Sequence, residues 1–345
     1  MSKTQFRVAL TADFYDSAGV ARYRDIGLDR LNSNRFRISR FDTHHPEIEP
    51  EQFAGADGVI VLTPRVTARS LSAADELLAI GRFGVGYDTV DVAACTSADV
   101  LLFITAGAVD RPVAEATVAW MLALTHHIRM KDRLVREARW DDRSQYMGCE
   151  LRGRTLGVVG FGGIGRAVIS LLGGFGMNPP LVYDPFATAE QTAAIGARLV
   201  PLDELLREAD FVSLHCPLTD ATRDLIGRRE LALMKPSSYF LNTARGGIVN
   251  EEALLEALLE KRIAGAALDC FDNEPLRAAP SFAALDNVLL APHCIAWTEE
   301  LFRDIGRTAC QGMIDLCEGR RPRGSINPEV FDRPGFQRKW ERVRG

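Results

Sequence analysis

The chain has 345 residues, of which 47% are hydrophobic and 25% charged, and its formal net charge is −5. This length and composition are typical of a globular protein of about two domains. The negative charge disfavours a nucleic-acid or anionic-membrane partner, and no stretch approaches the ~20 apolar residues of a membrane span. The start lacks a signal-peptide pattern, and the seven cysteines form no C-x-x-C pair. These features predict thiols in a reducing compartment, by default the cytoplasm.

The first part of the chain alternates strand and helix patterns. The apolar runs 6–12 and 57–63 predict strands, and residues 71–81 predict a helix. Residues 110–140 then predict one long helix, with Pro112 near its start, where a missing N–H costs little. A long helix after a set of strands is expected to act as a hinge between two domains.

A regular α/β alternation runs from residue 156 to residue 293. Its strand patterns are continuously apolar, which predicts a parallel sheet with helices on both faces. Residues 250–263 predict one of these helices, and another helix pattern follows residue 293. The basic tail, 331–345, is expected to be loosely held.

A glycine-rich loop lies between the first strand and helix of this region, in "TLGVVGFGGIGRAV". Gly160, Gly162 and Gly165 have the G-x-G-x-x-G spacing that permits a tight turn, close approach to a pyrophosphate and helix–strand packing. Gly163 and Ile164 complete the loop, where the N–H groups at the start of the helix are expected to face phosphates. The pattern therefore predicts a dinucleotide site.

An acid closes the next strand of this region. Asp184 lies 19 residues after Gly165, where a carboxylate accepts hydrogen bonds from a ribose diol and repels a 2′-phosphate. No arginine or lysine follows until Arg198. The cofactor is therefore predicted to be NAD.

Four charged residues stand at the ends of apolar strand patterns: Arg245, Asp269, Glu274 and His293. Ligands of an open parallel sheet bind outside the carboxyl ends of its strands. A ketone that receives a hydride also needs a proton, which a histidinium can supply, and a nearby carboxylate favours the charged ring. An arginine can bind a substrate carboxylate with two parallel hydrogen bonds. The set therefore fits hydride transfer to a keto acid.

Four segments resemble the signatures of the D-isomer-specific 2-hydroxyacid dehydrogenase family: "GRTLGVVGFGGIGR", "LNTARGGIVNEEAL", "GAALDCFDNEP" and "APH". The resemblance covers about Val61 to Pro328. It implies that Arg245, Glu274 and His293 are catalytic and that Asp269 contacts the nicotinamide. It also implies that backbone at Val85 and Gly86 holds the substrate carboxylate, and that Pro217 and Thr243 line the cofactor.

The resemblance implies an architecture of two Rossmann-like domains with parallel sheets. A discontinuous, flavodoxin-like substrate-binding domain would comprise residues 1–104 and 297–345, and an NAD-binding domain residues 105–296. The helix after residue 110 resembles the family's dimer element, so a homodimer is expected.

The implied activity is that of an NAD-dependent D-2-hydroxyacid dehydrogenase acting on a small 2-keto acid, most similar to glyoxylate or hydroxypyruvate reductase. A phosphoglycerate dehydrogenase-like enzyme and a non-enzymatic NAD-sensing corepressor stay open as alternatives. Formate dehydrogenase pairs its histidine with a glutamine, so Glu274 disfavours it.

Several residues have more than one interpretation. Gly163 stands where many family members carry arginine or lysine. Trp297 either walls the substrate pocket or packs, and Arg65 either meets a substrate or is solvated. His126 and His127 are expected to be solvated or to face a dimer partner. Three cysteines that follow strand-end polar residues are expected to act as small hydrophobic residues, and no metal site is predicted because the sequence shows no ligand spacing: Cys216, Cys270 and Cys294.

Overall fold

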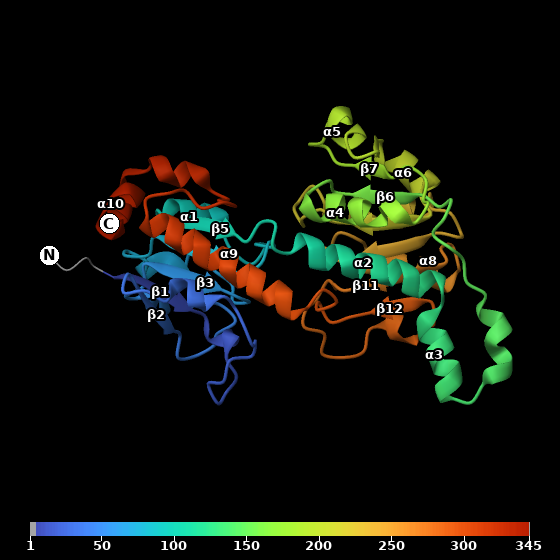
Figure 1. The fold of residues 1–345 in the computed structure, drawn as a ribbon, viewed down its shortest axis with the longest axis horizontal. Helices are drawn as coiled ribbons and strands as arrows, with labels where there is room; N and C mark the ends of the chain where they lie inside the picture. Colours follow the sequence, from blue (N-terminus) through green and yellow to red (C-terminus); the bar gives the residue numbers. More distant parts are fainter. Residues whose placement is uncertain (1–4, 345) are drawn as a thin grey trace. The chain divides into compact units, whose positions relative to one another are not determined.

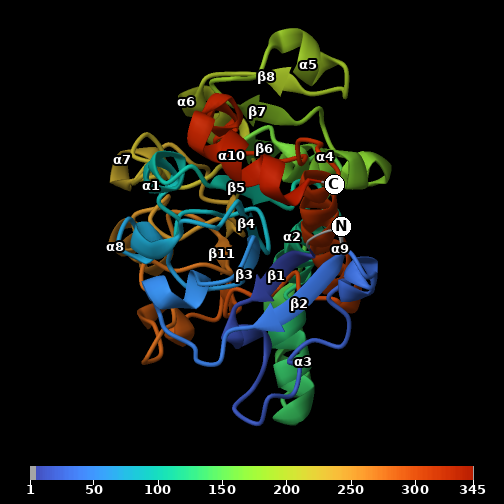
Figure 2. The same ribbon diagram turned by 90° about the vertical axis from the view of Figure 1, so that its left-hand side faces the viewer.

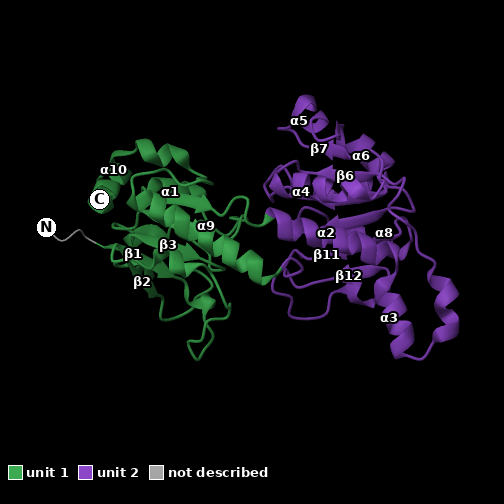
Figure 3. Ribbon diagram, in the orientation of Figure 1, with its two compact units in different colours: residues 1–109, 297–345 green, residues 110–296 purple. Residues whose placement is uncertain are grey.

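A computed structural model describes residues 5–344. The chain divides into two compact units, one running to Val109 and resuming at Trp297, the other spanning Asp110–Ala296 (Figure 3). Thr105 is hydrogen-bonded to Gly84 of the first unit. Its N–H donates to the carbonyl oxygen of Gly84 at 3.0 Å, and its hydroxyl accepts from the N–H of Gly84 at 3.1 Å. No helix of residues 5–344 is both long and apolar enough to cross a bilayer.

The first unit contains a parallel sheet in the order β2-β1-β3-β4-β5 (Figures 1 and 2). The strands are β1 (Phe6–Leu10), β2 (Phe36–Arg40), β3 (Gly58–Val61), β4 (Ala79–Arg82) and β5 (Leu101–Ile104), and the helices are α1 (Val92–Ser97), α9 (Glu299–Cys317) and α10 (Pro334–Val343). Helix α9 packs closely on this sheet because Gly58 and Gly81 leave room for the side chain of Met313. This strand order is the flavodoxin-like one.

The helix predicted over residues 71–81 is wrong. Residues 70–73 form only a 3-10 turn, and the last three residues of the segment, 79–81, belong to β4. Leu77 to Ile80 are all fully buried, as expected where a strand lies between two neighbours and is covered on both faces. A short continuous apolar run fits a buried strand as well as a helix, and here tertiary burial decides.

The C-terminal tail is also different from the prediction, because it forms α10 and is firmly packed. Phe336, Trp340 and Val343 are buried, and the Trp340 indole N–H donates to the carbonyl oxygen of Leu316 at 2.7 Å. The carboxylate of Asp57, 1% exposed, accepts from Arg342 at 2.8 Å.

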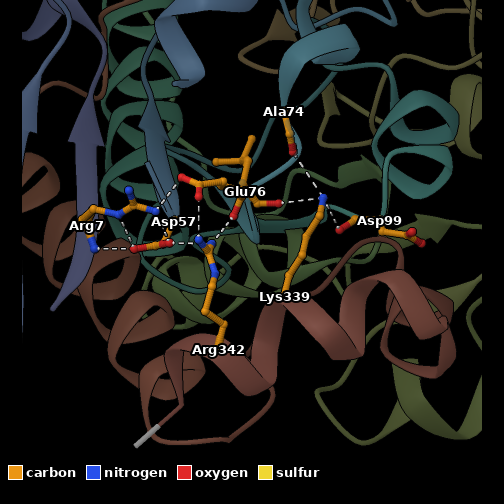
Figure 4. A network of polar contacts seen from close by, with 8 residues as sticks. Arg7, Asp57, Ala74, Glu76, Asp99, Lys339 and Arg342 are labelled. Carbon is orange, nitrogen blue, oxygen red and sulfur yellow. Dashed lines mark hydrogen bonds and ion pairs between the residues drawn. The ribbon is translucent and has the colours of Figure 1, made fainter. Parts of the chain in front are cut away.

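The same carboxylate of Asp57 also accepts from Arg7 at 2.8 Å (Figure 4). Lys339 donates to the carbonyl oxygens of Ala74, Leu77 and Ala98 at 3.2, 3.1 and 2.8 Å. The polar groups of the tail are thereby satisfied at the edge of the first unit.

The second unit contains a parallel sheet in the order β12-β11-β10-β9-β6-β7-β8. Its strands are β6 (Leu156–Val159), β7 (Leu181–Tyr183), β8 (Arg198–Leu199), β9 (Phe211–Leu214), β10 (Tyr239–Asn242), β11 (Gly265–Leu268) and β12 (Val288–Leu290). The order reverses between β6 and β9, so their carboxyl ends form the switch point at which such sheets bind ligands.

Helices cover both faces of this sheet, as its continuously apolar strands predict. Residues of α2 (Asp110–Thr125) and α4 (Gly163–Leu171) join the core on one face. Those of α6 (Leu202–Glu208), α7 (Arg228–Leu231) and α8 (Glu251–Leu259) join the core on the other. The remaining helices are α3 (Ile128–Arg136) and α5 (Ala189–Ala193).

The helix predicted over residues 110–140 is broken into α2 and α3. His127 adopts the left-handed conformation, with φ 50°, and the returning chain places the N–H of Cys149 on the carbonyl oxygen of Thr125 at 2.9 Å. A Cβ on Gly148 would lie 2.5 Å from that oxygen. The close return of the chain therefore ends α2.

Candidate active site and dinucleotide loop

The glycine-rich loop connects β6 to α4 at the switch point of the second sheet. Gly160 has φ 103°, and a Cβ there would lie 2.7 Å from the backbone of His215 and Cys216. Nothing lies within 4 Å of a Cβ built on Gly162, the N-cap of α4. Gly165 packs directly against the carbonyl oxygen of Gly160. The first and third glycines are thus required by close packing, whereas the second leaves open space at a helix N-terminus, as a pyrophosphate requires.

Asp184 follows β7 and is held by the backbone of the neighbouring loops. Its Oδ2 accepts from the N–H of Phe161 at 2.7 Å, and its Oδ1 accepts from the N–H of Phe186 at 2.8 Å. Each oxygen keeps a further acceptor position, so the carboxylate can still bind a ribose diol. Arg198, the first cation after it, is paired with Glu204 at 2.9 Å. These residues fit NAD.

Gly163 has a neighbour that the sequence did not indicate. A Cβ at this position would overlap the carboxylate of Asp110, which begins α2. Glycine at position 163 therefore leaves the space that the carboxylate of Asp110, from α2, occupies. Ile164 lies within α4 and packs against the core between α2 and α4.

His293 and Glu274 lie side by side, from the segments that follow β12 and β11. The Nδ1 atom of His293 lies 2.7 Å from Oε2 of Glu274, and Oε1 of Glu274 accepts from the N–H of Phe271 at 2.8 Å. His293 has φ 54°, a conformation that is uncommon outside glycine and concentrates at functional sites. Its backbone N–H donates to the carbonyl oxygen of Asp269 at 2.8 Å, which ties the main chain at His293 to the end of β11.

Opposing effects set the pKa of Glu274. Burial raises the pKa, but the hydrogen bond and charge of His293, the N–H of Phe271 and the charge of Arg245 together lower it below the ordinary value. Glu274 is therefore ionised at neutral pH. With Nδ1 turned to this carboxylate, the Nε2 atom of His293 is the nitrogen left for a substrate.

Asp269 is nearly buried, with 5% of its surface exposed. Its Oδ1 accepts from the N–H of Cys294 at 2.9 Å and from the N–H of Ile295 at 3.2 Å. Burial raises the pKa of Asp269 despite these two N–H groups and the charge of His293. The carboxyl therefore shapes the loop that carries His293.

Arg245 lies in the loop after β10, and its charge reaches Glu274. Its Nη1 donates to the carbonyl oxygen of Ala244 at 2.7 Å, and its own carbonyl accepts from Asn242 at 2.7 Å. The next residue, Gly246, lies so close to the backbone of Phe271 that no side chain would fit. The loops after β10 and β11 are therefore packed together.

The other predicted residues follow strands as well. Pro217 comes after β9, and Thr243 comes directly after β10, 3.5 Å from the hydroxyl of Thr117. Val85 and Gly86 belong to the first unit, where they follow β4 and are partly exposed. They are not among the residues that the second unit brings together.

Trp297 packs in the first unit with aromatic neighbours. Its ring centroid lies 6.0 Å from that of Tyr23 and 5.1 Å from that of Phe302, both edge-on, and 55% of the residue is exposed. Arg65 is exposed. His127 lies 6.1 Å, ring to ring, from Tyr146.

His215 was not singled out by its sequence context, and yet it lies against the dinucleotide loop. Its Nε2 is 2.9 Å from the hydroxyl of Ser213, and burial lowers the pKa of His215 to about 4. Among residues 5–344, Nδ1 of His215 is buried without a hydrogen-bond partner. Only the strand-end position, directly after "FVSL", could have indicated it.

Comparisons with known proteins identify the family that this chain resembles. The profile of the family "D-isomer specific 2-hydroxyacid dehydrogenase, NAD binding domain" matches residues 118–294. A glyoxylate reductase of Korarchaeum cryptofilum is 37% identical over 284 residues, which cover 81% of this chain and 85% of that protein.

A D-3-phosphoglycerate dehydrogenase of Methanocaldococcus jannaschii is 39% identical over 279 residues, which cover 80% of this chain. The match spans only 53% of that relative's length. Among solved structures, D-lactate dehydrogenase from Aquifex aeolicus complexed with NAD and lactic acid superposes with a TM-score of 0.78 at 27% identity, covering 90% of this chain and 96% of that one.

Proposed function

This chain belongs to the D-isomer-specific 2-hydroxyacid dehydrogenase family, and we propose from this premise that it interconverts a small 2-keto acid and its D-2-hydroxy acid with NAD. The residues of the second unit support this proposal, because a glycine loop, a diol-binding acid and a His–Glu pair all stand at the carboxyl ends of one sheet. A reduction like that of glyoxylate or hydroxypyruvate is the proposed reaction.

Reduction needs a hydride and a proton. When bound, the reduced nicotinamide supplies the hydride. His293, with Nδ1 held by Glu274, would donate a proton from Nε2 to the ketone oxygen, and the carboxylate stabilises the charged ring before transfer. In the oxidative direction the neutral ring would accept the proton of the hydroxyl group.

The substrate is held through its carboxylate in this proposal. Arg245 would bind the carboxylate and polarise the adjacent carbonyl group, and the backbone at Val85 and Gly86 would supply N–H donors. The first unit is thus proposed as the substrate-binding domain, and Pro217, Thr243 and Asp269 as residues along the nicotinamide half of the cofactor.

The proposal is carried by the 2.7 Å contact between His293 and Glu274. Replacing His293 with alanine should lower turnover by ~10²–10⁴, the range for a general acid, while NADH still binds. Turnover is followed by NADH absorbance and binding by NADH fluorescence. His126→Ala is the matched control and should retain both. Unchanged turnover in His293→Ala would refute the role.

Two other functions are separated by one panel of assays. The match to phosphoglycerate dehydrogenase favours testing 3-phosphohydroxypyruvate beside glyoxylate, hydroxypyruvate, pyruvate and bulkier keto acids, each with NADH and NADPH. Preference for the phosphorylated acid would replace the proposed substrate class. A protein that binds NADH but reduces none of them would be a cofactor sensor instead, as a corepressor is.

We also propose that the protein is a cytoplasmic homodimer. Four apolar side chains around α3 and the following 3-10 helix (Trp140–Tyr146) are exposed and would be covered by a second copy: Ile128, Val135, Trp140 and Met147. Light scattering after size exclusion should give twice the chain mass, and Val135→Asp should reduce it to one.

A further inference from the structure

A thiol, a carboxylate and an imidazole meet at the end of β11 and β12. One potential ligand atom from each of Cys270, Glu274 and His293 lies within 4.8 Å of the other two. Cys270 and Glu274 follow β11 in one loop, and His293 arrives from the next strand. We infer that these three side chains form an inhibitory site for a thiophilic divalent cation of the zinc class.

The donor set is the one that zinc prefers. Structural and catalytic zinc sites combine cysteine sulfur, histidine nitrogen and carboxylate oxygen in a tetrahedron, with bonds of ~2.0–2.3 Å. Such bonds place the ligand atoms ~3.4–3.6 Å apart. No ligand atom therefore has to approach another by much more than ~1 Å, and Nδ1 of His293 and Oε2 of Glu274, now 2.7 Å apart, have to separate by less than ~1 Å. Side-chain rotations supply movements of this size. A water molecule would take the fourth position. Magnesium and calcium select sites made of oxygen atoms, and they should not bind here.

The exposure of the three groups is uneven. The side chains of His293 and Glu274 are 43% and 32% exposed, whereas Cys270 is 3% exposed. A cation can therefore enter from the side of the His–Glu pair and meet the thiolate beneath it. Binding releases the thiol proton, because the thiolate is the metal ligand.

The cation competes with the proton that activates His293. A ring nitrogen that ligates a metal cannot carry a proton, so metal binding at either nitrogen prevents the histidinium form. The carboxylate of Glu274 would then ligate the cation and would no longer stabilise a charged His293 ring. Inhibition of reduction rests on the proposed function, whereas binding of the cation does not.

The sequence alone did not predict this site, because a stretch containing only Cys270 and Glu274 has no zinc-site spacing. His293 is 19 residues further along the chain than Glu274, and pairing of β11 with β12 brings it to them. Cys294, which directly follows His293 in sequence, is not a member of the group.

Cobalt(II) provides a spectroscopic test on the full-length, chelator-treated protein. A cobalt–thiolate bond gives a near-ultraviolet charge-transfer band, and a titration should show one equivalent bound in the wild type. Cys294→Ser, the matched control, should retain the band, and Cys270→Ala and Cys270→Val should lose it. Melting curves of all variants establish that they are folded. A wild type without the band, or a Cys270 variant that keeps it, overturns the proposal.

Zinc titration of the reductase reaction provides the second readout, with each variant normalised to its own metal-free rate. Zinc should inhibit the wild type and Cys294→Ser at least ten-fold more potently than the Cys270 variants, and magnesium should not inhibit. Equal potency on all four proteins overturns the proposal. A protein that shows the Cys270-dependent cobalt band but reduces no keto acid would instead retain the metal site and lose the proposed function.

Discussion

Replacing Glu274 with glutamine tests the His–Glu pair without changing its shape. The carboxylate satisfies two groups at once, since Oε2 meets Nδ1 of His293 at 2.7 Å and Oε1 accepts from the N–H of Phe271 at 2.8 Å. An amide has one acceptor oxygen. Glutamine can therefore serve one of these donors, and it supplies no charge to either.

The structure sets the magnitude of the effect. A hydrogen bond to a charged group contributes about 1.5–3 kcal/mol. Because the side chains of His293 and Glu274 are 43% and 32% exposed, solvent screening favours the lower half of that range. At 1.36 kcal/mol for each factor of ten, kcat/KM for reduction should fall ~10–50-fold.

The assay is NADH oxidation with a saturable keto acid at one fixed pH. Glu252→Gln, an exposed glutamate of α8, is the matched control and should keep the wild-type rate. A Glu274→Gln enzyme that is as fast as the wild type would refute the reasoning.

Three further predictions follow from other parts of the chain. Asp184→Ser should raise KM for NADH ~10–100-fold by removing charged hydrogen bonds to the ribose, with little change in kcat, and an unchanged KM would contradict the diol role. Burial lowers the pKa of His215 to about 4 in the folded protein, whereas in the unfolded chain it is near 6.5. Between these two pH values the unfolded chain binds one proton that the folded protein does not bind. Stability should therefore fall as the pH drops from 6.5 to 4, by about 2 kcal/mol between pH 7 and pH 5; urea unfolding should show a smaller loss in His215→Gln, and an equal loss would exclude His215 as the cause. Trp340→Ala should reduce the free energy of unfolding by about 3–5 kcal/mol, because a buried ring that bonds Leu316 is lost, whereas the exposed Arg338→Ala should change it by less than about 0.5 kcal/mol.

The parts of the fold that were predicted correctly depend on local pattern. The glycine spacing between β6 and α4, and the continuously apolar strands of the second sheet, indicate a dinucleotide-binding half directly. The placing of Glu274 beside His293 came from strand-end positions and from the family resemblance, and the structure brings the two side chains together.

The parts that were wrong or missed depend on contacts between distant segments. Residues 79–82 form a strand because other strands flank them, and the tail packs on the first unit, where the buried Asp57 binds Arg342. The break at His127 follows from a returning loop. Asp110 also lies against Gly163. The two residues are far apart in the sequence, so no local pattern could have predicted this contact.

The central claim is that one ring, paired with Glu274, gives a proton in reduction and takes it in oxidation. The most direct test is to measure kcat/KM in both directions for the wild type and for His293→Asn at one fixed pH. Both values should fall by ~10²–10⁴, the range for a general acid–base group, while NADH and NAD still bind. A His293→Asn enzyme that keeps the wild-type kcat/KM would contradict the account.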